Sequence, residues 1–295
     1  MAIPGPGTPI DLQDLADEFG GSTPHQISES YRGGGEVPNS AANSAVPTSG
    51  TISLGDFYGA VNVVTLNLTI SSNTNNYNLY PQVSGNPSYV AGATNINVTV
   101  NPGIRVGSTS RTGYAFQIPS QFNSGDNVTL INKGTIVGRA GNGGRGGNAP
   151  NGNAVAGQPG GHGLRIQRAV TIQNQGVIAG AGGGGGGSGA ARMIDGTTGK
   201  FNDPYFGEYS GSGGGGGGGF QVGVKGPRGS NPNPAKLGNN GANGTQTNGG
   251  AGGARRSSQA TPGSTAFIGK GGNGGNRGSN GQAGEWAQDF PSAQF

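Results

Sequence analysis

Apolar and polar residues alternate in three segments near the middle of the chain. The clearest alternation lies in residues 61–70 (VNVVTLNLTI), and it returns in residues 95–100 (NINVTV) and 127–131 (NVTLI). A period of two with many β-branched residues is typical of strands that bury one face. Turn residues separate the segments, as at Pro102-Gly103. The pattern predicts a small antiparallel β domain, sandwich-like or solenoid-like, within a fold that is mainly β.

One strand unit occurs twice. Residues 128–138 (VTLINKGTIVG) return 42 positions later as residues 170–180 (VTIQNQGVIAG), and each copy reads as a strand, a turn at Asn-x-Gly, a second short strand and a glycine run. A looser echo relates residues 267–275 (FIGKGGNGG) to residues 136–144 (IVGRAGNGG). Repeats of 20–50 residues are typical of stacked architectures. The glycine runs are therefore expected to follow strands in a repeated plan.

Glycine recurs at every third position in the second half of the chain. The ladders run through Gly138, Gly141, Gly144 and Gly147, through Gly157, Gly160 and Gly163, through Gly238, Gly241 and Gly244, and through Gly269, Gly272, Gly275, Gly278, Gly281 and Gly284. A helix with three residues per turn is the polyproline II form, which makes no hydrogen bonds within itself. Glycine along one edge lets such helices approach and bond to each other. The spacing predicts a polyglycine II helix bundle, a glycine-rich sandwich that presents loops.

Two other readings of the glycine-rich sequence compete with this prediction. Gly-rich sequence commonly behaves as a flexible linker, and ordering 67 glycines costs much entropy. A linker, however, has no reason to keep glycine at every third place. A collagen helix needs long G-X-Y runs rich in Pro, and only Gly226-Pro227-Arg228 has that look. The regular spacing favours an ordered bundle.

Residues 1–60 contain three related short units. They are residues 10–15 (IDLQDL), 26–31 (QISESY) and 52–58 (ISLGDFY). In the first and third, Asp or Ser precedes Asp by three positions, which predicts a capping box at a helix start. Glycines follow each unit and can end a helix. Helices this short do not persist alone, so the units are expected either to dock on a partner subunit or to form a tiny self-contained helical domain.

Composition narrows the classes of function. Only 30% of the 295 residues are hydrophobic and 10% are charged, and cysteine is absent, which excludes disulfides and thiol chemistry. No apolar run approaches 18 residues, so membrane insertion is not expected. The net charge of +4 is uneven, because residues 1–60 carry seven acids against one base. Ends of opposite sign suit a protein whose ends meet different partners.

Nucleic-acid binding is not expected. The basic residues are dispersed singly, and Arg255-Arg256 is their only adjacent pair. Aromatic residues are not interleaved with them as a stacking platform requires.

Candidate catalytic and metal-binding residues are sparse. Nothing brings His25 and His162 together, and His162 is expected at the surface of a glycine helix. Asp195, Asp203 and Glu208 could supply paired carboxylates for glycan cleavage, but they lie in one loop, which rarely fixes the needed geometry. The G-x-G-x-x-G match within residues 182–187 lacks the following helix and the acidic residue of a nucleotide site. No catalysis, metal or cofactor is therefore expected.

Recognition is expected in the segments between the glycine runs. Residues 190–210, 220–237 and 254–267 combine aromatic, polar and charged residues. Loops held by a stiff scaffold commonly carry binding residues. The aromatic candidates are Phe201, Tyr205, Phe206, Tyr209 and Phe220. Packing of these rings into a small core is the alternative at each position.

Two groups of motifs resemble bacteriophage virion proteins. Residues 49–60 (SGTISLGDFYGA) resemble a module common in phage tail and fibre proteins. The strand-Asn-x-Gly units that lead into VGRAGNGGRGG and IAGAGGGGGGSG look like the receptor-recognising tip adhesins of T-even-like phages. In that family a sandwich of polyglycine II helices displays variable loops that bind an outer-membrane protein or a surface sugar. This chain differs in carrying the fibre-type module and a β domain in front.

The resemblance implies a division of labour along the chain. Residues 1–60 form the virion-docking module, 61–126 the β domain, 127–287 the glycine-rich domain with inserted loops, and 288–295 a tail. Tyr31, Phe57 and Tyr58 are expected to dock on other phage tail or fibre proteins, and the five loop aromatics are expected to bind a bacterial surface protein or glycan. The implied location is the virion, in a tail or fibre, and a homotrimer and a monomer both remain open.

The sequence also allows two functions other than that of an adhesin. A structural virion protein, such as a decoration, head-fibre or tail component, would have no receptor role. An ice-binding glycine-helix protein would need a flat face of repeated Thr or Ala, and the irregular inserts argue against one.

Overall fold

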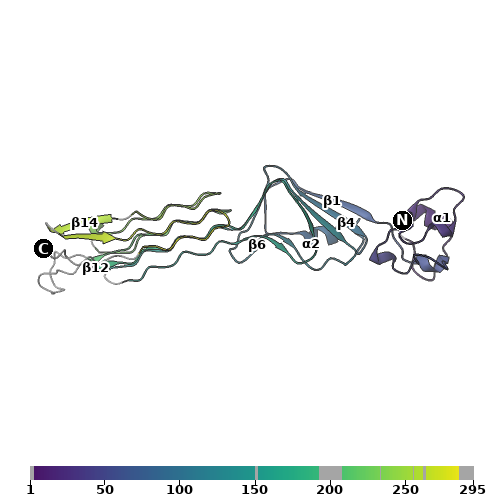
Figure 1. Ribbon diagram of the computed structural model, residues 1–295, viewed down its shortest axis with the longest axis horizontal. Coiled ribbons are helices and arrows are strands. Elements are labelled where there is room, and N and C mark those ends of the chain that lie inside the picture. Colours follow the sequence, from purple (N-terminus) through teal and green to yellow (C-terminus); the bar gives the residue numbers. More distant parts are fainter. Residues whose placement is uncertain are drawn as a thin grey trace.

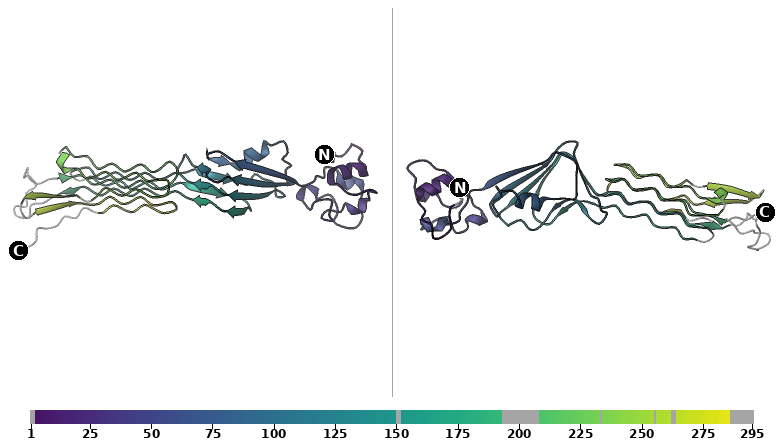
Figure 2. Two further views of the ribbon diagram at one scale, coloured as in Figure 1. Left: turned by 90° about the horizontal axis from the view of Figure 1, so that it is seen from above. Right: turned by 180° about the vertical axis from the view of Figure 1, so that it is seen from behind.

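The computed structural model of the chain is a rod made of three successive parts (Figure 1). The structure describes residues 3–149, 152–192, 208–232, 234–254, 256–261 and 264–285. A helical domain lies at one end and a β domain in the middle, and a bundle of extended glycine-rich segments forms the other end (Figure 2). The N-terminal domain and the far end of the glycine-rich bundle therefore lie far apart.

The N-terminal domain has a core of its own. It contains α1 (Leu12–Phe19) and the 3-10 turns η1 (Ile27–Glu29), η2 (Ala41–Asn43) and η3 (Leu54–Phe57). Both predicted capping boxes are confirmed, with the amide of Asp11 donating to Asp14 and that of Ser53 to Asp56, each at 2.8 Å. The core consists of Ile3, Leu15, Phe19, Val37, Val46, Phe57 and Ala60. Of the two arrangements open from the sequence, the structure has the self-contained helical domain.

The β domain is a three-sided solenoid of parallel strands. The first sheet contains β1 (Val64–Ile70), β4 (Thr94–Val100), β7 (Asn127–Asn132) and β10 (Thr171–Asn174). The second contains β2 (Thr74–Asn75), β5 (Arg105–Gly107), β8 (Thr135–Val137) and β11 (Val177–Ala179). The third contains β3 (Tyr77–Asn78), β6 (Tyr114–Ile118) and β9 (His162–Ile166). The chain visits the three sheets in turn, which gives the triangular outline in Figure 1.

The antiparallel β domain expected from the sequence is wrong, because all the strand pairs of these three sheets are parallel. Alternation of apolar and polar residues reports one buried face and does not distinguish the two kinds of pairing. The turn at Pro102-Gly103 does not return the chain to a neighbouring strand but leads from β4 to β5, which belongs to another sheet. Parallel partners need a long connection, and the other two sides of the triangle supply it.

The repeat of 42 residues corresponds to stacked coils of this solenoid. Thr129 pairs with Thr171, and Ile136 pairs with Ile178. The third coil is interrupted between β8 and β9, where residues 138–161 leave the solenoid, enter the glycine-rich bundle and return. The chain leaves again after β11 and stays in the bundle up to the last described residues.

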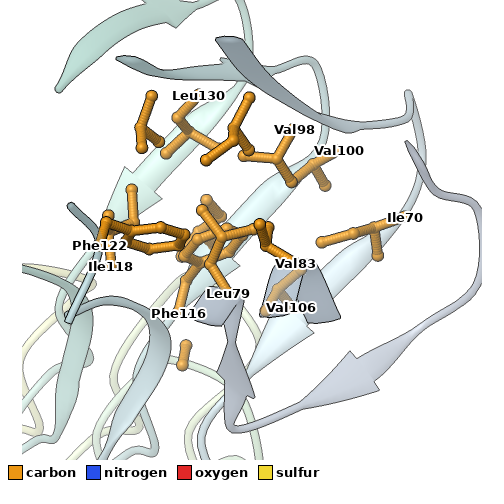
Figure 3. Close-up of a cluster of buried hydrophobic side chains, with 14 of the residues drawn as sticks. Ile70, Leu79, Val83, Val98, Val100, Val106, Phe116, Ile118, Phe122 and Leu130 are labelled. Carbon is orange, nitrogen blue, oxygen red and sulfur yellow. The ribbon is translucent and has the colours of Figure 1, made fainter. Parts of the chain in front are cut away.

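An apolar core fills the triangle (Figure 3). Val98, Leu130 and Phe116 are fully buried, as are Leu79 and Val83 of the short helix α2 (Leu79–Ser84). The ring of Tyr77 lies 5.0 Å from that of Phe116. The apolar residues of the alternating pattern face this core, since every second residue of β4 is buried.

The glycine-rich part consists of extended segments that run alternately away from the β domain and back. They span residues 138–149, 152–161, 180–190, 210–219, 220–232, 238–245, 248–254, 269–277 and 278–285. Their backbone groups bond from one segment to the next, because no segment bonds within itself as a helix does. The polyglycine II conformation of each segment stays a prediction, and what the structure describes is this pairing between segments.

Residues 211–219 form the centre of the bundle. Their N–H groups donate in rotation to three neighbouring segments: Gly214 to Gly144, Gly215 to Gly272 and Gly216 to Ala242, at 2.9, 2.9 and 3.0 Å. Their carbonyls accept from three other segments, so six segments surround this one. A segment with neighbours on all sides has no direction left for a side chain. This explains the unbroken glycine run, whereas outer segments need glycine only where they face inward.

Close approach of the backbones makes these glycines necessary. A Cβ atom on Gly215 would lie 1.9 Å from the carbonyl oxygen of Gly250, and one on Gly185 would lie 2.0 Å from that of Gly272. Asparagine completes the pairing at the surface, because the side-chain oxygen of Asn142 accepts from the amide of Val224 at 3.0 Å and that of Asn273 accepts from the amide of Gly252 at 2.9 Å. These two Asn residues are at equivalent positions of the similar segments 136–144 and 267–275.

We expect Gly185→Ala to destabilise the bundle. The added methyl group would overlap backbone, and overpacking of this kind costs about 1–3 kcal/mol or more. Gly189→Ala is the matched control, since a Cβ there meets nothing within 4 Å. Thermal unfolding of the two variants measures the difference, and equal melting temperatures would contradict the proposed close packing.

A second prediction concerns a polar group inside the β domain. Asp126 is 1% exposed and accepts from the hydroxyl of Tyr89 at 2.7 Å and from the amides of Gly92, Thr94 and Asn123. Burial and the bond to Asp126 raise the pKa of Tyr89 above its ordinary value of 10.0. In the unfolded chain the phenol ionises near its ordinary pKa, so the contribution of Tyr89 to stability is lost as the pH rises above that value.

Tyr89→Phe should therefore cost about 1–2 kcal/mol at neutral pH, where the hydrogen bond is lost. The difference in unfolding free energy between wild type and variant should shrink above pH 10. Chemical denaturation at neutral pH and at high pH measures it, and a difference that stays constant across this range would contradict the assigned role of the phenol.

Candidate functional site

The two ends of the glycine-rich bundle differ in their connections. Next to the β domain the turns are short, as at Gly219, which has a φ of 151°, and at Gly278, which has a φ of 73°. The far end, called here the distal end, carries longer connections (Figure 1). They include the pair β12 (Ala191–Arg192) and β13 (Glu208–Tyr209), the 3-10 turn η4 (Pro234–Lys236), and the hairpin of β14 (Arg256–Thr261) and β15 (Ser264–Ile268).

Antiparallel pairing fixes where the longest distal connection begins and ends. Ala191 pairs with Tyr209, and Arg192 pairs with Glu208. Residues 193–207 lie between these paired positions and outside the described residues. The second hairpin has an irregular register near Gln259 and Thr261. The described ends of segments 190–210 and 254–267 therefore lie at the distal end, whereas residues 220–232 of the segment 220–237 run along the bundle.

Buried serines lie where the central glycine runs stop, next to the distal connections. Ser188, Ser210 and Ser212 are each 0% exposed. The side-chain oxygen of Ser188 accepts from the amide of Ser212 at 2.8 Å, and that of Ser210 accepts from the amide of Gly238 at 3.1 Å. The hydroxyls thereby satisfy backbone donors where the glycine run stops. Sequence reasoning missed these residues, although the change from glycine to Ser-Gly-Ser at residues 210–212 was the available signal.

Of the predicted receptor-binding aromatics, the structure describes Tyr209 and Phe220, and it places them at opposite ends of the bundle. Phe201, Tyr205 and Phe206 lie outside the described residues. Tyr209 is 3% exposed at the distal end. Phe220 lies at the opposite end of the bundle, beside the β domain, where the guanidinium of Arg105 is 4.6 Å from its ring centre.

Phe220 joins the bundle to the solenoid. A Cβ atom on Gly107 would lie 2.4 Å from its ring, so the ring occupies the space that glycine leaves on β5. The amide of Phe220 donates to Gly138 at 3.1 Å, and its carbonyl accepts from Ala140 at 3.1 Å. These contacts explain why an aromatic residue follows the central glycine run.

The predicted docking residues occupy different environments. Phe57 is 0% exposed in the N-terminal core, so its ring is not available to a partner. Tyr31 is half-buried, and its hydroxyl donates to the carbonyl of Gly50. Tyr58 is half-buried at the end of η3. Among the three, Tyr31 and Tyr58 keep surface that a partner can reach.

His162 lies on β9, and the prediction that it sits on a glycine helix is wrong. Its ring stacks on that of Tyr114 at 5.3 Å, and the guanidinium of Arg165 lies 4.9 Å from the same tyrosine. Among the residues that the structure describes, no group of three His, Asp or Glu side chains could hold a metal ion. None of the described helices is long and apolar enough to cross a membrane.

Comparison with known proteins assigns the chain to a family. Residues 65–294 match the family described as phage tail fibre adhesin Gp38. The chain belongs to this family. It is a phage tail fibre adhesin that attaches to host cells, and its place is the tail fibre of the virion. The resemblance to phage tip adhesins drawn from the glycine ladders is confirmed.

The adhesin is also similar to one solved structure. This is the crystal structure of the gp37-gp38 adhesin tip complex of the bacteriophage S16 long tail fiber, with 22% sequence identity and a TM-score of 0.49. The similarity covers 96% of this chain and 87% of that chain. No curated protein matches the chain.

Proposed function

We propose that this adhesin attaches to the host through the connections at its distal end and docks on the fibre through its N-terminal helical domain. The observation that carries the proposal is the asymmetry of the bundle, with short turns beside the β domain and the strand pairs β12–β13 and β14–β15 at the opposite end (Figures 1 and 2). The two ends of the rod then meet different partners.

The bundle suits this role because it holds its segments rigidly. Each inner segment bonds to several neighbours, so the positions where the distal connections begin and end are fixed before a receptor arrives. A preorganised site pays less ordering entropy on binding. Loops on a rigid scaffold can also vary in sequence without changing the scaffold.

Within the distal end, we assign receptor contact to Phe201, Tyr205 and Phe206, which fall between the paired ends of β12 and β13. Aromatic side chains supply large contact area at low entropic cost. Tyr209 and Phe220, predicted as contacts from the sequence, are assigned supporting roles because of their burial and their place in the bundle. The partner is a bacterial surface protein or glycan, and the attachment is non-enzymatic.

At the other end, the N-terminal domain offers an acidic surface to other tail or fibre proteins. Residues 1–60 hold seven acidic residues and the single base Arg32. Tyr31 and Tyr58 are assigned to the contact, with Phe57 supporting them from the core. Attraction to a basic partner surface would speed association and weaken with salt. A homotrimer stays a prediction, which light scattering of the purified chain tests.

Replacing Phe201, Tyr205 and Phe206 together by Ala should reduce binding of the full chain to host cells by about tenfold or more, because aromatic contacts dominate binding energy. Val224→Ala is the control, since Val224 is 56% exposed on the flank of the bundle. Saturation binding to intact cells measures the effect. Unchanged binding by a folded triple variant would exclude these residues as the contact.

Tyr58→Ala should weaken co-purification with the partner fibre protein while leaving host-cell binding and melting temperature nearly unchanged, because its ring is only half-buried. Phe57→Ala should instead unfold the N-terminal domain, at a cost of about 3–5 kcal/mol for an aromatic core residue. A Tyr58→Ala variant that still docks at wild-type strength would remove Tyr58 from the interface.

A further inference from the structure

A groove runs along the flank of the bundle, away from the distal end. It is lined by residues 249–251 and 273–276 and by Ser279, Asn280 and Gln282, which belong to three neighbouring segments. Its volume is about 440 Å³, within the range of pockets that hold small ligands. We propose that this groove binds a neutral oligosaccharide, as a second attachment site separate from the distal connections.

The polar side chains of the groove keep amide groups available to a ligand. The side-chain oxygens of Asn273 and Asn276 accept from the amides of Gly252 and Gly249 at 2.9 and 3.0 Å, which sets the orientation of both amide groups. Within the described part of the chain, neither amide nitrogen donates a hydrogen bond. The side chains of Asn280 and Gln282 likewise make no hydrogen bond there. The groove therefore offers preorganised donors together with free amides.

The chemistry of the lining selects an uncharged ligand. The groove is lined by amide and hydroxyl side chains together with glycines and Ala251, with no charged side chain among them. Arg277 follows Asn276 in sequence, but its guanidinium donates to the carbonyl of Gln246 at 2.5 Å, in the turn beside the β domain. A charged ligand would lose hydration there without gaining a partner of opposite charge.

Among neutral ligands, the lining favours a sugar over a peptide. Hydroxyls around a sugar ring both donate and accept in many directions, as side-chain amides do. A peptide strand would need a regular row of backbone partners, whereas the outward amides of Gly249 and Gly252 are already occupied by asparagine side chains. The glycines among the lining residues let a flat ring approach the backbone closely.

This inference rests on the proposed attachment to a cell surface, where glycans surround the receptor. A weak site on the flank would add to the distal contact through effective concentration, without needing high affinity itself. The groove and the assigned distal aromatics can be altered separately, because the groove lies on residues 249–282 and the aromatics fall between β12 and β13.

The test is saturation-transfer NMR of the full chain with three neutral trisaccharides, built from glucose, galactose or N-acetylglucosamine. Sialyllactose serves as the charged probe, and a neutral Asn- and Gly-rich hexapeptide as the peptide probe. Asn280→Trp places an indole in the groove without removing a bond of the bundle. Asn153→Trp is the matched control, since Asn153 is exposed on another segment.

We expect at least one neutral trisaccharide to bind, with about tenfold or greater loss in Asn280→Trp and none in Asn153→Trp. The variant lacking Phe201, Tyr205 and Phe206 should keep the saccharide signal even if it no longer binds cells. Absence of binding by all three trisaccharides, equal binding by Asn280→Trp, or binding of the charged or peptide probe alone would overturn the proposal. A failure of the distal assignment would show in the cell assay alone.

Discussion

The hydrogen bond from the backbone N–H of one glycine-rich segment to a carbonyl of its neighbour is the interaction on which this adhesin depends. Each such bond contributes about 0.5–1.5 kcal/mol net, while each glycine costs about 0.5–1 kcal/mol in backbone entropy relative to alanine. The bundle is therefore stable only because the bonds are made together. Gly214, Gly215 and Gly216 show this, since each donates to a different segment.

The sequence indicated this bundle because the same constraint acts on every segment. A Cβ atom would overlap a carbonyl wherever a segment faces inward, so spacing alone reveals which edge is inside. The capping boxes at Asp11 and Ser53 were equally predictable, since they depend on residues three positions apart. Strand direction was not predictable in this way. Strand direction depends on where the chain goes after a turn such as Pro102-Gly103. Alternation of apolar and polar residues is the same in parallel and antiparallel strands, so it does not predict that direction.

The candidate site was predicted less completely than the scaffold. Aromatic residues were chosen by their place between glycine runs, yet Phe220 packs on Gly107 and Tyr209 is buried. A ring that follows a glycine run looks the same in sequence whether it faces a partner or the next domain. The polar flank groove was invisible for a related reason, since Asn276 and Gln282 come together only when their segments lie side by side.

The excursion of residues 138–161 from the third coil of the solenoid has a mechanical consequence. The chain enters the bundle after Val137, returns to the solenoid before His162 and enters the bundle again after Ala179. The backbone therefore crosses between the two parts three times. A load applied at the distal end is shared among these strands and cannot act on a single hinge. A recombination crossover within residues 138–179 would have to restore both the solenoid and the bundle at once, whereas a crossover in a distal connection leaves both intact.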